Sequence, residues 1–93
     1  MVTRCLENRV YAVTANRTGT ETRGERSLHF QGKSQITGPD GSILFRAAEE
    51  TEECRVIEID PSLARNKSIN PLNDLFDNRR TELYGELMKR RQW

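Results

Sequence analysis

Apolar residues fall into short clusters along the chain, and their spacing predicts alternating short helices and strands. Residues 3–8 are typical of the last turns of a helix, with Cys5 and Leu6 on one side. Residues 10–16 carry no charge and place small, β-branched and aromatic side chains on both faces, which predicts a strand buried on both faces. A single small domain has little with which to cover two faces of a strand, so this pattern indicates that a neighbouring layer is missing.

The middle of the chain divides into a polar segment and a hairpin. Residues 17–33 are polar and contain three glycines, which predicts a long loop. Two short apolar runs at 34–37 and 42–46 follow, separated by the sequence GPDG at 38–41. Proline presets φ, and aspartate and glycine favour turns, so the three segments predict a β-hairpin.

The last forty residues predict one strand and several short helices. The acidic run at 49–53 is interpreted as a solvated turn, and residues 54–59 are predicted to form a strand. Asp60 as the N-cap and Pro61 at the first helical position predict a helix over 61–67. Two more helices are predicted, over 73–80 with Asn73 as its cap and over 82–91 with Thr81 as its cap.

Composition restricts the chain to one small domain, or part of one, over residues 1–93. Apolar residues make up 34% and charged residues 31%, so we expect a thin core. The net charge of +1 offers no field to attract nucleic acid or an anionic membrane surface. No apolar stretch approaches the length of a membrane span, and we expect no membrane partner.

Candidate catalytic and metal-binding side chains are few and scattered. Cys5 is expected to be a small core residue, and Cys54 follows glutamates that would make its thiol a poor nucleophile. His29 lies between Leu28 and Phe30 and is expected to be a packing residue. These three residues lack the spacing of a zinc site, so no metal or other cofactor is predicted. Two cysteines without a disulfide framework, and no apolar leader, favour a cytoplasmic protein.

The basic C-terminal segment also allows a nucleic-acid interpretation. Arg79, Arg80 and the sequence KRRQW at 89–93 combine cations with one aromatic ring. Cations at a helix end are more commonly partners of the helix dipole. We therefore predict no nucleic-acid partner.

Four sequence segments together resemble the C-terminal third of a carbon–nitrogen hydrolase of the nitrilase superfamily. They appear in that family's order and spacing and cover nearly the whole chain. The segments are RCLENRVYAVTANRTGTE (4–21), FQGKSQITGPDGSIL (30–44), VIEIDPSLARNK (56–67) and NDLFDNRRTELYG (73–85).

The resemblance implies an α+β fold in which this chain is the C-terminal part of a four-layer αββα sandwich, incomplete by itself. It also implies catalysis by a glutamate base, a lysine and a cysteine nucleophile, all at positions that precede this chain. Cys5, Glu7 and Lys33 do not match those positions, so no catalytic residue is predicted here. Residues that border the substrate pocket in the family map, by resemblance, to Asn16, Glu21, Gly32 and Ser34.

The leading hypothesis is therefore a C-terminal fragment of a hydrolase that acts on amides, carbamoyl compounds or nitriles, inactive by itself. Its expected partners are a missing N-terminal portion or further copies of itself, with a small amide or nitrile bound only in an intact enzyme. The alternative is a non-catalytic interaction module that complements an N-terminal half supplied by another chain.

Overall fold

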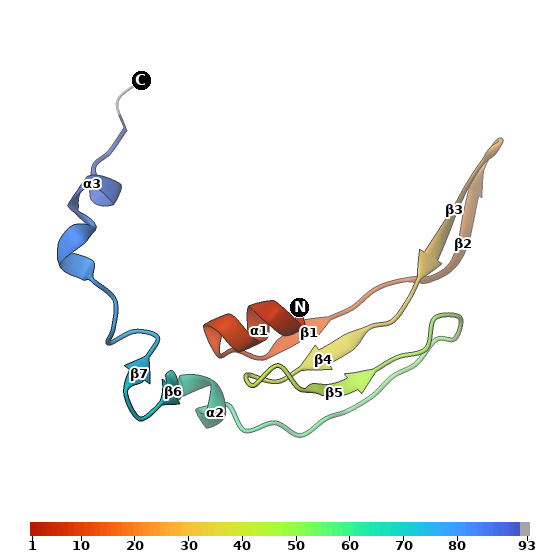
Figure 1. Ribbon diagram of the computed structural model, residues 1–93. Coiled ribbons are helices and arrows are strands. Elements are labelled where there is room, and N and C mark those ends of the chain that lie inside the picture. The colour runs from red at the N-terminus through yellow and green to blue at the C-terminus, as the bar shows by residue number, and fades with distance from the viewer. Residues whose placement is uncertain (92–93) are drawn as a thin grey trace.

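The computed structural model describes residues 1–91, and these combine short helices with small antiparallel sheets in an α+β arrangement (Figure 1). The first element is helix α1 (Val2–Asn8), which confirms the helix predicted over 3–8. It ends at Arg9, whose φ of 54° lies in the left-handed region common at helix C-termini. The Val10 N–H then donates to the Cys5 carbonyl at 3.1 Å.

The central sheet has the order β1-β4-β5 with every pair antiparallel, and consists of β1 (Ala12–Thr14), β4 (Gln35–Thr37) and β5 (Ile43–Arg46). Strands β4 and β5 form the hairpin that the turn sequence predicts. The Gly38 N–H donates to the Ser42 carbonyl at 2.8 Å, and Gly41 has the positive φ of 80° that the turn requires.

Strand β1 is shorter than the strand predicted over 10–16, and it is not buried on both faces. Val13 is 76% exposed, because none of the described elements covers the face from which its side chain projects. The expectation of a doubly buried strand is thus wrong for the described part of this chain.

The long loop predicted over 17–33 is wrong, because this segment forms a second hairpin. Strand β2 (Thr18–Arg23) pairs with β3 (Arg26–Gln31) in an unbroken antiparallel register. The β-branched residues Thr18, Thr20 and Thr22 favour the extended chain. Gly24 has a φ of 59° at the first turn position, so the two strands connect tightly. The hairpin projects from the sheet as an arm (Figure 1).

The strand predicted over 54–59 is also wrong. This segment belongs to no sheet among the described residues. It is attached to β5 by side chains, as the Arg55 guanidinium lies 5.3 Å from the centre of the Phe45 ring. A strand needs a neighbouring ladder for its backbone hydrogen bonds, and none of the described strands provides one here.

Helix α2 (Ser62–Arg65) confirms in shortened form the helix predicted over 61–67. The Asp60 carboxylate accepts hydrogen bonds from the Ser62 N–H at 3.0 Å and the Ser62 hydroxyl at 2.7 Å. These bonds hold the turn that leads into the helix. The N-cap of α2 is Pro61, so the predicted cap at Asp60 lies one residue too early, and the helix begins one residue later than expected.

The helix predicted over 73–80 is wrong. Its first two residues form β7 (Asn73–Asp74), which pairs with β6 (Ser68–Asn70), and residues 75–78 form a turn. The reason is local: the Asn70 side chain accepts from the Leu72 N–H, and the Asp74 carboxylate accepts from the Phe76 and Asp77 N–H groups. Such bonds give the backbone an alternative to a helix.

The region predicted as a helix over 82–91 contains two short pieces instead. These are the 3-10 helix η1 (Thr81–Leu83) and the helix α3 (Gly85–Met88). Thr81 makes no side-chain capping bond, so the expected cap does not form. Leu87 and Met88 are 81% and 82% exposed, so the apolar face of this segment is not packed in the described structure.

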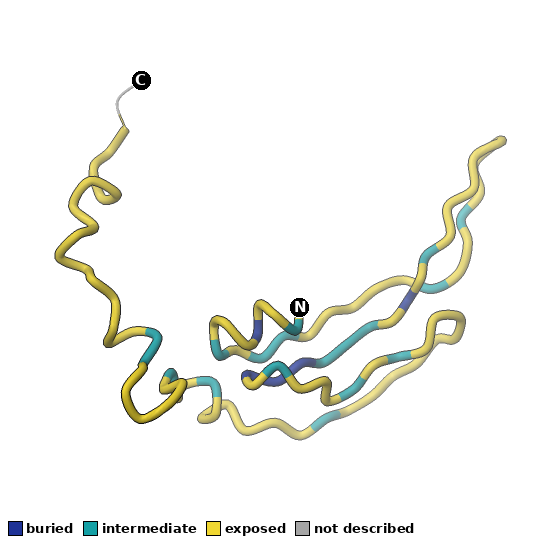
Figure 2. The backbone as a smooth tube through the Cα atoms, viewed as in Figure 1, coloured by how far each residue is buried: buried dark blue, intermediate teal, exposed yellow. Residues whose placement is uncertain are grey.

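The core is very small. Cys5 and Thr37 are fully buried, whereas most of the described chain is exposed or half-buried (Figure 2). The accessible surface is 8219 Å², against about 5,500 Å² expected for a compact monomer of this mass. The radius of gyration is 19.4 Å, against about 12 Å expected for 93 residues. The described chain is therefore open rather than compact.

Two basic side chains join the C-terminal segment to the end of α1. The Arg9 side chain donates to the Asn66 carbonyl at 3.4 Å. The Lys67 ammonium donates to the carbonyls of Asn8 and Arg9, each at 2.9 Å. These are unsatisfied carbonyls at a helix C-terminus, where a cation also complements the helix dipole. None of the described helices is both long and apolar enough to cross a membrane.

Candidate functional site

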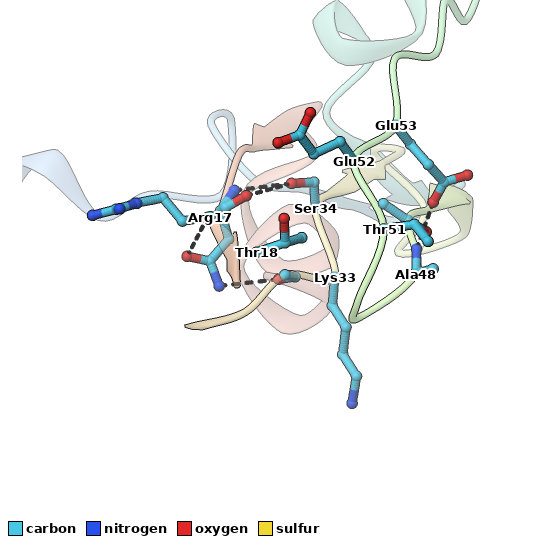
Figure 3. A pocket seen from close by; sticks show the side chains of 11 residues that line it. Arg17, Thr18, Lys33, Ser34, Ala48, Thr51, Glu52 and Glu53 are labelled. Atoms are coloured by element: carbon cyan, nitrogen blue, oxygen red, sulfur yellow. Dashed lines mark hydrogen bonds between the residues drawn. The ribbon is translucent and has the colours of Figure 1, made fainter. Parts of the chain in front are cut away.

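Three of the four predicted substrate-binding residues line one hollow of about 380 Å³ at the end of the central sheet (Figure 3). Asn16 follows β1, while Gly32 and Ser34 form the bend between β3 and β4. The fold thus brings Asn16 next to Gly32 and Ser34, which follow it by 16 and 18 positions in the sequence. Whether they bind substrate remains a prediction.

Asn16 and Ser34 fasten the end of β1 to the start of β4. The Ser34 hydroxyl accepts from the Asn16 N–H at 2.9 Å and donates to the Asn16 carbonyl at 3.3 Å. The Asn16 amide donates to the Gly32 carbonyl at 3.0 Å and accepts from the Arg17 N–H at 2.9 Å. These bonds leave a free lone pair on Ser34 and a free N–H on Asn16, so each side chain can still make one hydrogen bond to a ligand.

Gly32 is required both by backbone conformation and by space. Its φ is 58°, and a Cβ at this position would lie 2.7 Å from the Glu49 carbonyl oxygen and 2.9 Å from the Ala48 carbonyl oxygen. Only glycine lets the backbone of residues 48 and 49 approach this closely. The backbone of the opposite wall of the hollow therefore packs directly against Gly32.

That opposite wall is the segment 47–53, which we call the acidic wall. Its backbone is joined to the bend by the Ala47 N–H donating to the Ser34 carbonyl at 2.7 Å, and by the Lys33 N–H donating to the Ala48 carbonyl at 3.3 Å. The Glu53 carboxylate accepts from the Ala48 N–H at 2.6 Å, a hydrogen bond that joins the two ends of the acidic wall.

The interpretation of residues 49–53 as a plain solvated turn missed this role. The remaining residues of the hollow, which the sequence-based prediction did not include, are Arg17, Thr18, Lys33, Ala47, Ala48, Thr51, Glu52 and Glu53. The available signal was position alone, since the acidic run follows β5, the hairpin strand that ends beside Ser34.

Some charged side chains around the hollow are paired with an opposite charge, and one is not. Lys33 points away from it (Figure 3), and its ammonium pairs with Glu49 at 2.6 Å. That hydrogen bond lowers the pKa of the Glu49 carboxyl from its ordinary value. The Glu52 carboxylate lines the hollow and makes no hydrogen bond or ion pair with another described residue. The hollow is thus polar, with one uncommitted carboxylate.

Glu21, the fourth predicted residue, lies elsewhere. It is on the β2–β3 arm, where its carboxylate pairs with Arg17 at 3.3 Å and with Arg23 at 3.6 Å. It lines a separate hollow of about 520 Å³ with Arg23, Arg26, Ser27 and Leu28. The arm carries Glu21 away from the other three residues.

The scattered residues considered for metal binding remain apart. Cys5 is buried in α1, Cys54 is exposed in the segment after the acidic wall, and His29 on β3 contacts Thr20 at 3.0 Å and Glu50 at 3.3 Å. Within residues 1–91 no group of three His, Cys, Asp or Glu side chains has the arrangement of a metal site.

The basic side chains considered for nucleic-acid binding are in part engaged locally. Arg79 stacks over Phe76 at 4.9 Å, and Arg80 pairs with Glu82. Lys89 pairs with Glu86. Gln92 and Trp93, the end of the predicted KRRQW segment, lie outside the described residues.

Comparison with known proteins gives consistent matches. The family model described as Carbon-nitrogen hydrolase matches residues 1–67. The chain is 52% identical over 84 residues to a protein named nitrilase from Pyrococcus abyssi (strain GE5 / Orsay), covering 90% of this chain and 30% of that protein.

Two further relatives give the same pattern. The chain is 38% identical over 85 residues to an N-carbamoylputrescine amidase of Oryza sativa subsp. japonica, covering 87% of this chain and 28% of that protein. It is 35% identical over 86 residues to an (R)-stereoselective amidase of a Pseudomonas species, covering 92% of this chain and 29% of that protein. The chain thus spans less than a third of the length of each of these relatives.

Proposed function

Because this chain belongs to the carbon–nitrogen hydrolase family, we propose that it forms the C-terminal part of an enzyme that hydrolyses amides, carbamoyl compounds or nitriles. In this proposal the chain completes a four-layer αββα sandwich whose other strands come from outside residues 1–93. The relatives carry the names of hydrolases, which does not favour the alternative of a non-catalytic module.

One observation carries the proposal: the chain matches about 30% of the length of its relatives, all of them named as hydrolases. The uncovered β1 face, with Val13 exposed, is what a strand inside a sandwich would present before its partner layer is added. The excess of accessible surface supports the same arrangement. The sheet and its apolar side chains then become interior on completion.

In the completed enzyme, the glutamate, lysine and cysteine that the resemblance implies come from the remaining part. This chain contributes a rigid polar edge to the site. Asn16, Gly32 and Ser34 border the substrate, with the free N–H of Asn16 and the free lone pair of Ser34 available to it. A strand end holds such groups in place, while the acidic wall closes the other side.

The first test joins this chain to the part of the Pyrococcus abyssi nitrilase that it does not match. We expect the completed chimera to release ammonia from primary amides, carbamoyl compounds or nitriles, and the 93-residue chain alone to release none. The unmatched part of the relative, expressed alone, is the control. Hydrolysis by this chain alone that disappears in Cys5→Ser would contradict the proposal, since Cys5 would then be a nucleophile.

The second test concerns the substrate-bordering residues in the active chimera. We expect Ser34→Ala to lower kcat/KM more than twofold, a change of about 0.4 kcal/mol. Ser68→Ala, in the C-terminal segment, is the matched control and should leave kcat/KM unchanged. Unchanged kinetics in Ser34→Ala would show that the fastening of β1 to β4 is only structural. Glu21→Gln, measured in parallel, decides whether the β2–β3 arm reaches the substrate.

A further inference from the structure

Lys33 has a backbone conformation that its side chain does not favour. Its φ is 57°, in the left-handed region that glycine adopts readily and that residues with a side chain adopt rarely and with strain. Lys33 follows Gly32, so two consecutive residues of the bend are left-handed. Such a conformation persists only where the surrounding structure compensates for it.

The compensation comes from the acidic wall. The Lys33 N–H donates to the Ala48 carbonyl at 3.3 Å, and its ammonium pairs with the Glu49 carboxylate at 2.6 Å. The left-handed backbone lets one residue make both contacts with the same wall. Next to this pair, Glu50 contacts the His29 ring at 3.3 Å, which adds a second attachment between the wall and β3.

The wall also depends on close backbone contact at the adjacent residue. The Ala48 and Glu49 carbonyls lie directly over Gly32, where a side chain could not fit. Residues 48–53 are exposed, so little apolar packing reinforces this backbone contact. The Lys33 ammonium adds an electrostatic contact beside it.

We propose that Lys33 and Glu49 form an electrostatic latch that holds the acidic wall against the bend, which makes Lys33 a positioning residue for the hollow. The latch determines where Thr51, Glu52 and Glu53 lie relative to Asn16 and Ser34. Its relevance to substrate rests on the proposed function, whereas its existence is tested without any activity measurement.

The latch is measured on the completed chimera by two NMR readouts, because the chain alone is expected to associate or to pack loosely. One is the titration of the Glu49 carboxyl. The other is the exchange rate of two amides that join the wall to the bend: the Lys33 N–H, which donates to Ala48 of the wall, and the Ala47 N–H of the wall, which donates to Ser34. Both partners are about half exposed, at 50% and 53%, so solvent screens the pair. We expect a two- to fivefold increase in exchange when the latch is removed.

Two variants remove the Lys33 ammonium and differ in how they affect the backbone strain at this position. Lys33→Met keeps the left-handed strain, while Lys33→Gly relieves it. In both, the Glu49 carboxyl should titrate at a higher pH than in the parent chain, and the wall amides should exchange faster. Faster exchange in Lys33→Gly is the sharper result, because its bend is less strained than that of the parent.

Arg23→Met is the matched control, since it removes an exposed cation paired with Glu21 on the arm and should change neither readout. The exchanged pair Lys33→Glu with Glu49→Lys should restore slow exchange. The latch is ruled out if Glu49 titrates identically in the parent and both Lys33 variants, or if the wall amides exchange at parental rates. Neither result would bear on whether the chimera hydrolyses its substrates.

Discussion

Gly24 and Gly32 have nearly the same left-handed backbone, with φ of 59° and 58°, but very different surroundings. Nothing lies within 4 Å of a Cβ built on Gly24, whereas a Cβ on Gly32 would meet the Glu49 carbonyl at 2.7 Å. The two positions therefore separate the conformational demand for glycine from the spatial one. Comparing substitutions at the two glycines therefore isolates the stability that comes from packing the acidic wall against Gly32.

We predict that Gly32→Ala destabilises the completed chimera clearly more than Gly24→Ala does. The left-handed conformation costs each alanine roughly 1–2 kcal/mol, and overpacking at Gly32 adds roughly 1–3 kcal/mol. Urea unfolding of the parent and both variants measures the difference. Equal destabilisation would mean that the backbone of residues 48 and 49 does not rest on Gly32.

At the scale of elements, the β4–β5 turn and the start of α2 use the same device. Asp40 and Asp60 each accept from the N–H and hydroxyl of the serine two residues later. The side-chain hydrogen bond from serine is the main cause that lowers the pKa of each aspartate below its ordinary value of 3.8. Each turn is therefore held by an ionised carboxylate.

We predict that the β4–β5 turn loosens in acid. Because the folded pKa of Asp40 is lowered, its stabilising contribution is present above pH 3.8 and is lost as the pH falls through the folded pKa. The Ser42 amide should lose protection from exchange over that range, and Asp40→Asn should remove the dependence. Asp60→Asn is the matched control and should leave the Ser42 profile unchanged. A Ser42 profile that Asp40→Asn does not alter would contradict this assignment.

Helix α1 and the β4–β5 hairpin were predictable, because the spacing of apolar residues and the turn residues that specify them lie close together in the chain. Local side-chain bonds to the backbone were not predicted, so the helix expected over 73–80 was wrong. The segment 54–59 has a strand-like sequence but no strand beside it among the described residues, so its pattern was misleading. The β2–β3 hairpin was missed because glycines and charges hide its alternation.

The candidate site was predictable in part for the same reason. Asn16, Gly32 and Ser34 were identified through the family resemblance, and the sheet register brings them together. Glu21 was predicted to border the same pocket, but it lies on the β2–β3 arm, where it pairs with Arg17 and Arg23. Glu52 and Glu53 were missed because an acidic run has the same composition whether it faces solvent or a hollow.

At the scale of the whole molecule, the exposed surface exceeds that of a compact monomer by about 2,700 Å². This excess is larger than the total area buried in a standard protein–protein interface, about 1,600 Å². Large apolar side chains contribute to this exposed surface on most of the elements. The large apolar residues more than half exposed include Val13, Leu28, Val56, Leu63, Ile69, Leu72, Phe76, Leu83, Leu87 and Met88.

We predict that the 93-residue chain alone associates with itself or stays loosely packed, because uncovered apolar surface and unpaired strand edges favour association. Sedimentation should show concentration-dependent species, and a dye that binds exposed apolar surface should fluoresce strongly. The completed chimera is the control and should bind much less dye, since its added strands cover the same residues. A monomer that binds no dye and unfolds in one sharp transition would contradict the prediction. It would show that the chain needs no partner layer.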